Sequence, residues 1–64
     1  MNVYIEKEDR VLSIKEKHTG RSLLEFLNLN PSTVLLVKNG EIVLDDEIFE
    51  NDDDIKILSV ISGG

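Results

Sequence analysis

The stretch at residues 54–64 constrains this chain more than any other part of its sequence. Polar and apolar side chains alternate over residues 54–57, which is the pattern of a β-strand with one buried face. The stretch ends in Gly63 and Gly64. Because glycine is about 7% of average composition, two glycines in a row at a given place have a chance of roughly 0.5%. We therefore expect a central strand that leads into a tail with a function of its own.

The expected tail comprises Ser62, Gly63 and Gly64. Glycine has no Cβ, so a Gly-Gly tail can thread a narrow channel and adopt backbone angles that are closed to other residues. The carbonyl carbon of Gly64 would be unhindered toward an attacking atom. A flexible tail that presents the Gly64 carboxylate for chemistry is one interpretation, and a disordered end or residual cloning sequence is the other.

Length and composition narrow the class of protein. We expect 64 residues to form one domain, and a domain of that size buries only about 60% of its unfolded-chain surface. The absence of cysteine excludes disulfides, thiolate nucleophiles and Cys-ligated metals. No apolar run approaches the roughly 18–20 residues of a membrane span, and no signal peptide is recognisable. A soluble cytoplasmic protein is expected.

The charge is strongly acidic. The sequence has thirteen Asp and Glu residues and seven Lys and Arg residues, which gives a net charge of −6. Nucleic-acid binding needs a basic footprint, so this class of function is disfavoured. The charge indicates either a partner with a basic surface or a device that keeps a small protein in solution.

Hydrophobic periodicity predicts five strands and one helix. Residues 1–14 are typical of a β-hairpin, and Thr19 is a plausible N-cap for a helix that ends before Pro31. The helix face expected to cover the sheet carries Leu23, Leu24, Phe26 and Leu27. The order β-β-α-β-β-β predicts a two-layer α+β domain with a mixed sheet, its last strand central if it pairs in parallel with the first.

The second half of the chain contains the strongest turn signal. A strand at residues 34–38 is followed by Asn39 and Gly40, which both tolerate the positive φ of a type I′ turn. The connection over residues 45–50 is expected to place Ile48 or Phe49 in the core. The acidic run at residues 51–54 lacks the spaced ligands of a calcium loop and is interpreted as a solvated turn.

Strand parity predicts which side chains face outward. If Lys56 faces water, Ile55 and Ile57 face the helix, and Leu58 and Val60 share the outer face. If Lys38 faces water, Leu35 and Val37 point inward and Leu36 outward. An exposed apolar cluster on a small acidic domain usually marks a binding surface. The expected partner-binding residues are Tyr4, Leu36, Leu58 and Val60.

No catalytic constellation is recognisable, so the chain is not expected to be an enzyme. His18 is the sole histidine, and neither a nucleophile nor a second metal ligand stands near it in the sequence. We therefore expect no metal site and no bound cofactor.

The motifs together resemble the ThiS/MoaD sulfur-carrier family, including archaeal small modifiers and Urm-type proteins. The resemblance covers the element order of the whole chain, and its specific part is the Asn39-Gly40 hairpin and the strand that ends in Gly63-Gly64. It implies a ubiquitin-like β-grasp fold with a five-stranded sheet packed on one main helix. The sequence departs from the family at Lys38, where many relatives are aliphatic, and at Ser62, where small apolar residues are common.

The resemblance also implies a mechanism and partners. The Gly64 carboxylate would be adenylated by a ubiquitin-activating-type enzyme that uses ATP. It would then become a thiocarboxylate, with sulfur passed to a synthase of thiamine, molybdopterin or tRNA 2-thiouridine biosynthesis, or it would be joined to a lysine of a target protein. Leu58 matches an apolar position presented to the activating enzyme. A monomer is expected.

A second class of function stays open at this point, because β-grasp domains serve many roles. The chain would then be a non-covalent interaction module whose terminal glycines are incidental. The two classes differ in whether the protein changes mass after incubation with ATP and an activating partner.

Overall fold

A computed structural model describes residues 1–60 of the chain. The strands of the main sheet are β1 (Asn2–Ile5), β2 (Arg10–Ser13), β4 (Val34–Lys38), β5 (Glu41–Val43) and β7 (Asp54–Ser59). The remaining elements are the 3-10 turns η1 (Glu6–Glu8) and η2 (Pro31–Thr33), the helix α1 (Gly20–Phe26), and two short strands, β3 (His18–Thr19) and β6 (Ile48–Phe49).

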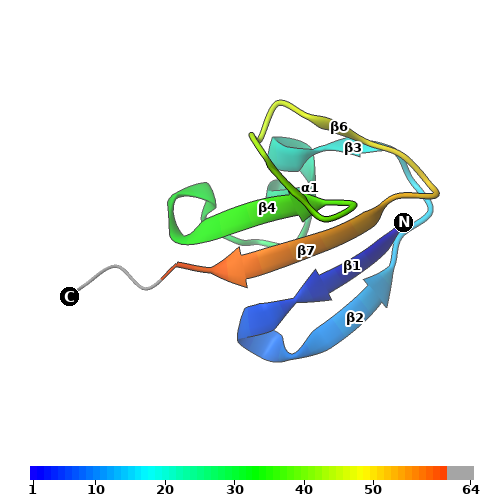
Figure 1. Cartoon of the computed structure of the whole chain (residues 1–64). Helices are drawn as coiled ribbons and strands as arrows, with labels where there is room; N and C mark the ends of the chain where they lie inside the picture. The colour runs from blue at the N-terminus through cyan, green and yellow to red at the C-terminus, as the bar shows by residue number, and fades with distance from the viewer. Residues whose placement is uncertain (61–64) are drawn as a thin grey trace.

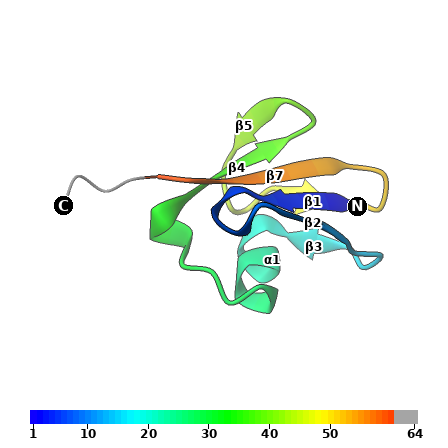
Figure 2. The same ribbon diagram turned by 90° about the horizontal axis from the view of Figure 1, so that it is seen from below.

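The main sheet has the order β2-β1-β7-β4-β5. β7 lies at its centre and pairs in parallel with β1, which is the arrangement that the sequence predicted. Its other neighbour, β4, is antiparallel. The helix α1 covers one face of the sheet, and the other face is open (Figures 1 and 2). This is the α+β, ubiquitin-like β-grasp architecture with a mixed five-stranded sheet, and the predicted fold class is confirmed.

The core lies between the sheet and α1. Ile55 and Ile57 of β7 are each 1% exposed, which confirms the predicted parity of that strand. Phe49 of β6 is fully buried and closes the core from the side of the long connection. The other core side chains are Met1, Val3, Ile5, Ile14, Leu23, Leu24 and Leu36.

The helix begins where the sequence predicted and ends earlier. The Thr19 hydroxyl accepts a hydrogen bond from the Ser22 amide at 3.1 Å, so Thr19 is the N-cap. The helix stops at Phe26 because Asn28 takes a left-handed conformation, with φ of 60°. The prediction that Pro31 ends the helix was wrong, since Pro31 instead begins η2.

Phe26 does not cover the sheet, contrary to prediction. A rotation of about 100° per residue places Leu23, Leu24 and Leu27 toward the core and carries Phe26 to the flank of the helix. Its side chain is 60% exposed, and its ring lies 5.4 Å from the ring centre of His18. Apolar character alone did not distinguish the flank of a short helix from its buried stripe.

The predicted parity of β4 was also wrong. Leu36 is 4% exposed and in register with Ile57, whereas Leu35 is 42% exposed and lies opposite Leu58. Lys38 does not face the open side: it lies in register with Ile55 on the covered face, at the end of the strand. From there its ammonium reaches Glu47 Oε2 and the Ile48 carbonyl oxygen, each at 3.1 Å.

Two turns organise the end of the sheet at which β4 finishes and β7 begins. Asn39 and Gly40 both have positive φ, 50° and 87°, as the predicted type I′ turn requires. The Asn39 side chain donates to Asp53 Oδ1 and accepts from the Asp54 amide, both at 2.9 Å. The acidic run is therefore a turn bonded to the neighbouring hairpin, and within residues 1–60 no group of three His, Cys, Asp or Glu side chains could hold a metal ion.

The two-residue strands β3 and β6 pair antiparallel over the helix side of the molecule. Their pairing buries Phe49 and leaves Ile48 48% exposed, which settles the two alternatives for the connection. Two residues are too few for a periodic pattern, so this small sheet was not predicted. No helix in the described part of the chain is long and apolar enough to cross a membrane.

Candidate functional site

The predicted tail begins just beyond the central strand. Ser62, Gly63 and Gly64 lie outside the described residues. The end of β7 is held on both sides: the Ser59 amide donates to Glu6 Oε1 and the Val60 amide donates to the Thr33 carbonyl oxygen, each at 2.9 Å. The end of β7 is thus fixed to two neighbouring segments, through Ser59 to η1 and through Val60 to η2.

The open face of the sheet brings together three of the four predicted partner-binding residues. Tyr4 lies opposite Lys56 across the β1–β7 pair, and Leu58 follows two residues later on the same face. Val60 continues this alternation and is 43% exposed. The fourth residue, Leu36, is in the core, and its neighbour Leu35 takes its place opposite Leu58.

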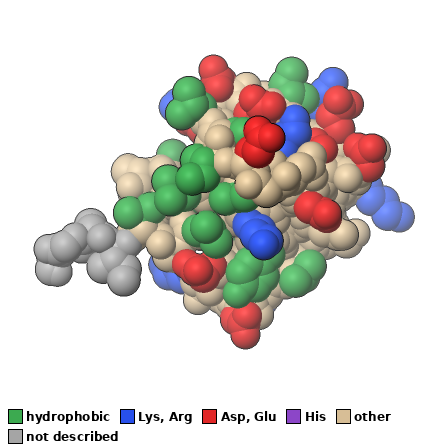
Figure 3. All heavy atoms as spheres, viewed as in Figure 1, with side chains coloured by type: hydrophobic (Ala, Val, Ile, Leu, Met, Phe, Trp, Pro, Cys, Tyr) green, Lys and Arg blue, Asp and Glu red, His purple; other side chains and the backbone are tan. Residues whose placement is uncertain are grey.

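Further apolar side chains extend this surface beyond what the sequence predicted. Ile42 lies opposite Val37, and Val11 lies opposite Tyr4. Figure 3 shows hydrophobic side chains gathered over β7 and its neighbours on this face, toward the carboxyl end of β7. We name this surface the open-face patch, and its members are Tyr4, Val11, Leu35, Val37, Ile42, Leu58 and Val60.

Tyr4 is held in place by the β1–β2 turn. Its hydroxyl donates to Asp9 Oδ1 at 3.1 Å, and Asp9 occupies a left-handed conformation with φ of 49°. The hydrogen bond to Asp9 raises the pKa of the Tyr4 phenol above 10.0, so the ring stays neutral at physiological pH. Tyr4 therefore offers an apolar ring to the open-face patch while its polar end is satisfied elsewhere.

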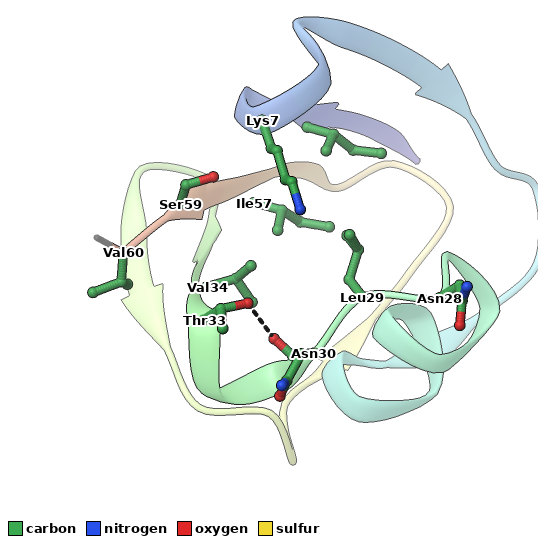
Figure 4. A pocket seen from close by; sticks show the side chains of 10 residues that line it. Lys7, Asn28, Leu29, Asn30, Thr33, Val34, Ile57, Ser59 and Val60 are labelled. Atoms are coloured by element: carbon green, nitrogen blue, oxygen red, sulfur yellow. Dashed lines mark hydrogen bonds between the residues drawn. The ribbon is translucent and has the colours of Figure 1, made fainter. Parts of the chain in front are cut away.

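A pocket lies beside the end of β7, on the side away from the open-face patch. Its volume is about 530 Å³, and it opens between η1, the segment after α1 and the end of β7. In Figure 4 the side chain of Lys7 extends over the pocket, while that of Val60 points away from it. The lining consists of Ile5, Leu29, Val34 and Ile57 with the polar residues Asn28, Asn30, Thr33 and Ser59 around them. Sequence reasoning missed this pocket because three distant segments form it.

His18 makes no catalytic pair. Its Nδ1 lies 2.9 Å from Ser22 Oγ, and its Nε2 is buried without a hydrogen-bond partner among residues 1–60, 3.9 Å from Glu16 Oε2. Ser22 belongs to the first turn of α1, on the far side of the sheet from the open-face patch. The arrangement is that of a packed side chain beside Phe26. Within residues 1–60, His18 therefore adds no acid, base or nucleophile at the end of β7.

Comparison with known proteins agrees with this geometry. A family model described as the ThiS family matches residues 2–64, which includes both terminal glycines. A relative from Thermus thermophilus, described as the sulfur carrier protein TtuB, is 41% identical over 58 residues. The match covers 89% of this chain and 88% of the relative.

Proteins of this kind are small carriers and are not themselves enzymes. Such a carrier depends in general on an activating enzyme and on a partner that receives the sulfur. The structure combines an anchored central strand with an open apolar face, and the family match extends through Gly64. The chain belongs to the ThiS family of sulfur carriers.

Proposed function

We propose that this protein carries sulfur as a thiocarboxylate on Gly64, after adenylation of the Gly64 carboxylate by a ubiquitin-activating-type enzyme. The observation that carries the proposal is the family match over residues 2–64, which extends through the diglycine. ATP is the cosubstrate of the partner enzyme, and no cofactor is assigned to the carrier. The cytoplasm, where ATP is available, is the proposed location, and the carrier acts as a monomer.

The chemistry is carried out by the partner. A carboxylate oxygen of Gly64 attacks the α-phosphorus of ATP, and pyrophosphate leaves. A hydrosulfide-equivalent nucleophile from a sulfur donor then attacks the activated carbonyl carbon and displaces AMP, which leaves a thiocarboxylate. If the amine of a target lysine attacks instead, the product is an isopeptide bond and AMP again leaves.

The carrier contributes position. The bonds from Ser59 to Glu6 and from Val60 to Thr33 fix the base of the tail relative to the open-face patch. A partner that docks on this surface would thereby hold Gly64 at a limited distance from the docking site. The docking residues are Tyr4, Leu35, Leu58 and Val60. Positioning of this kind matters because a displacement of about 1 Å can cost about a hundredfold in rate.

The sulfur of the thiocarboxylate would pass to a thiamine or molybdopterin synthase or to a tRNA-thiolating enzyme, whereas in the other reaction Gly64 itself would be joined to a protein lysine. Identification of proteins joined to Gly64, or of thiocarboxylate-dependent synthases in the native host, would assign it. The acidic charge of −6 fits a protein partner better than direct contact with nucleic acid.

The proposal is tested by ATP–pyrophosphate exchange and intact mass with the adenylating enzyme of the same organism. The wild type should support exchange and, with a sulfur donor, gain the mass difference between sulfur and oxygen. Deletion of Gly64 shortens the reach by about 3.3–3.6 Å and should abolish exchange. The matched control is Ser13→Gly, a small change on the edge strand β2 that should leave exchange intact.

The alternative is a non-covalent interaction module, which the open-face patch alone would also support. In that case the protein lacking Gly64 would bind its partner and behave as the wild type, and no mass change would occur with ATP. If the protein lacking Gly64 supported exchange at the wild-type level, Gly64 would not be the reacting residue and the proposed function would be overturned.

A further inference from the structure

The open-face patch contains a positive charge near its centre. Lys56 is exposed on β7, the central strand, and lies opposite Tyr4 on one side and Val37 on the other. Leu58 is two residues away on the same face, a spacing of about 7 Å. Figure 3 shows a Lys or Arg side chain among hydrophobic ones in the middle of this face. A partner surface that covers Leu58 and Tyr4 must therefore also cover Lys56.

The stem of Lys56 is part of the apolar surface. Val37 lies between Lys56 and Ile42 in the sheet register and is only 9% exposed, although α1 covers the opposite face. Its flanking side chains must therefore cover it, as long lysine stems commonly do. A stem that covers Val37 stays near the sheet, which limits how far the ammonium can move toward a solvated rim.

The ammonium of Lys56 has no countercharge within residues 1–60. None of the ion pairs of the described residues includes it. Asp54, two residues earlier on the same face, is not within ion-pair distance. By contrast, Lys38 on the covered face is paired with Glu47 and lies 3.8 Å from Asp53.

We infer that the surface that docks on the open-face patch presents a carboxylate opposite Lys56, and that Lys56 thereby helps to select the partner. Covering a lysine with an apolar surface leaves an unpaired buried charge, which costs far more than a paired one. A carboxylate at that point removes the penalty and rejects surfaces that lack it. The partner considered is the adenylating enzyme, so the inference rests on the proposed function.

The test compares three changes at Lys56 in the ATP–pyrophosphate exchange assay, with the concentration of carrier varied. Lys56→Met keeps most of the stem over Val37 and should raise KM for the carrier about tenfold, because the partner's carboxylate is left unpaired. Lys56→Glu should raise KM by about a hundredfold through like-charge repulsion, with kcat within about twofold. Lys56→Arg should stay close to the wild type.

Two controls separate this effect from general electrostatics. Lys17→Glu makes the same charge change at an exposed lysine just before β3 and should leave KM unchanged. Asp54→Asn should also leave KM unchanged, and an effect equal to that of Lys56→Met would mean that the countercharge comes from this chain. Thermal unfolding of each variant checks that the fold is retained.

Several outcomes overturn the inference. A KM for Lys56→Met that is equal to or lower than that of the wild type would mean that the partner surface opposite is apolar. Equal effects of Lys56→Glu and Lys17→Glu would mean that only net charge matters. In both cases wild-type exchange persists and the proposed function stands. If the wild type supports neither exchange nor calorimetric binding to this enzyme, the proposed function and the inference both fail.

Discussion

The two faces of β7 carry similar aliphatic side chains in very different surroundings. Ile55 and Ile57 are each 1% exposed under α1 and Phe49, whereas Leu58 on the opposite face is half-buried and Lys56 is exposed. The difference arises from the covering layer, because both faces belong to one strand with one hydrogen-bonding pattern. A buried aliphatic side chain holds the fold together, and an equivalent one on the open face remains available for a partner.

The largest difference between a covered and an exposed position is expected at β6, in the small second sheet. Phe49→Ala should cost about 3–5 kcal/mol of unfolding free energy, since it removes a fully buried aromatic ring from the core. Ile48→Ala, at the neighbouring and 48% exposed position, should cost less than about 1 kcal/mol. Urea unfolding measures both, and equal losses would mean that β6 does not seal the core.

The assignment of β4 to its two faces can be tested in the same way. Leu36→Ala should cost about 2–5 kcal/mol because Leu36 packs in the core. Leu35→Ala should cost less than about 1 kcal/mol and should instead weaken the partner enzyme's use of the carrier. If Leu35→Ala cost more stability than Leu36→Ala, Leu35 would face the core, as the sequence predicted.

A pH titration examines the Asp53 carboxylate, which lies 3.8 Å from Lys38 at the end of the covered face. The backbone amide of Glu50 and the side chain of Asn39 bond the Asp53 carboxylate, and with the nearby Lys38 they hold its pKa below the usual 3.8. A lowered folded-state pKa gives stability that is present above the unfolded pKa and is lost as pH falls through the folded value. The stability gap between the wild type and Asp53→Asn should therefore shrink below about pH 4.

The Lys38 pKa is raised, chiefly by its hydrogen bond to Glu47, so that its contribution is present at neutral pH and is lost only as pH rises through the folded value. The acid limb of the titration thus reports on Asp53 and not on Lys38. Thermal melts between neutral pH and pH 3 provide the measurement. A gap that stays constant over this range would mean that Asp53 stabilises the turn without its charge.

The smallest effect on stability is expected on the open face. Leu58→Glu should change the unfolding free energy by less than about 1 kcal/mol, because its side chain has no covering layer. The same change should sharply weaken adenylation by removing an apolar anchor. Val11 is 68% exposed on the edge strand of the same face. Val11→Glu therefore serves as the matched control, and it should cause a smaller loss of adenylation. A collapse of stability for Leu58→Glu would place Leu58 in the core.

Much of this structure followed from local sequence patterns. The Asn39-Gly40 turn, the Thr19 cap and the parity of β7 were predicted because each depends on backbone angles or alternation over a few residues. The error at Leu36 had a different origin, since Lys38 can lie on a covered face only through Glu47 and the Ile48 carbonyl oxygen, nine and ten residues away. Contacts of that range leave no periodic signal.

The residues of the candidate site also fall into those that local patterns predicted and those that depend on distant contacts. Tyr4, Leu58 and Val60 were placed on the open face by alternation within their own strands. Leu35 and the pocket that Lys7 overhangs were missed, because both depend on which segments meet at the end of β7. The sequence thus identified single strands well and their assembly less well.

The central position of β7 has a consequence for how the protein is made. β7 follows every other described strand along the chain, yet it pairs directly with β1, the first of them. The sheet therefore cannot close around its middle strand until translation has passed Ser59, and such distant pairing is slow compared with local hairpin formation. A nascent chain that stops early lacks the strand on which both halves of the sheet depend. Both halves of the sheet are thus synthesised before the strand that joins them.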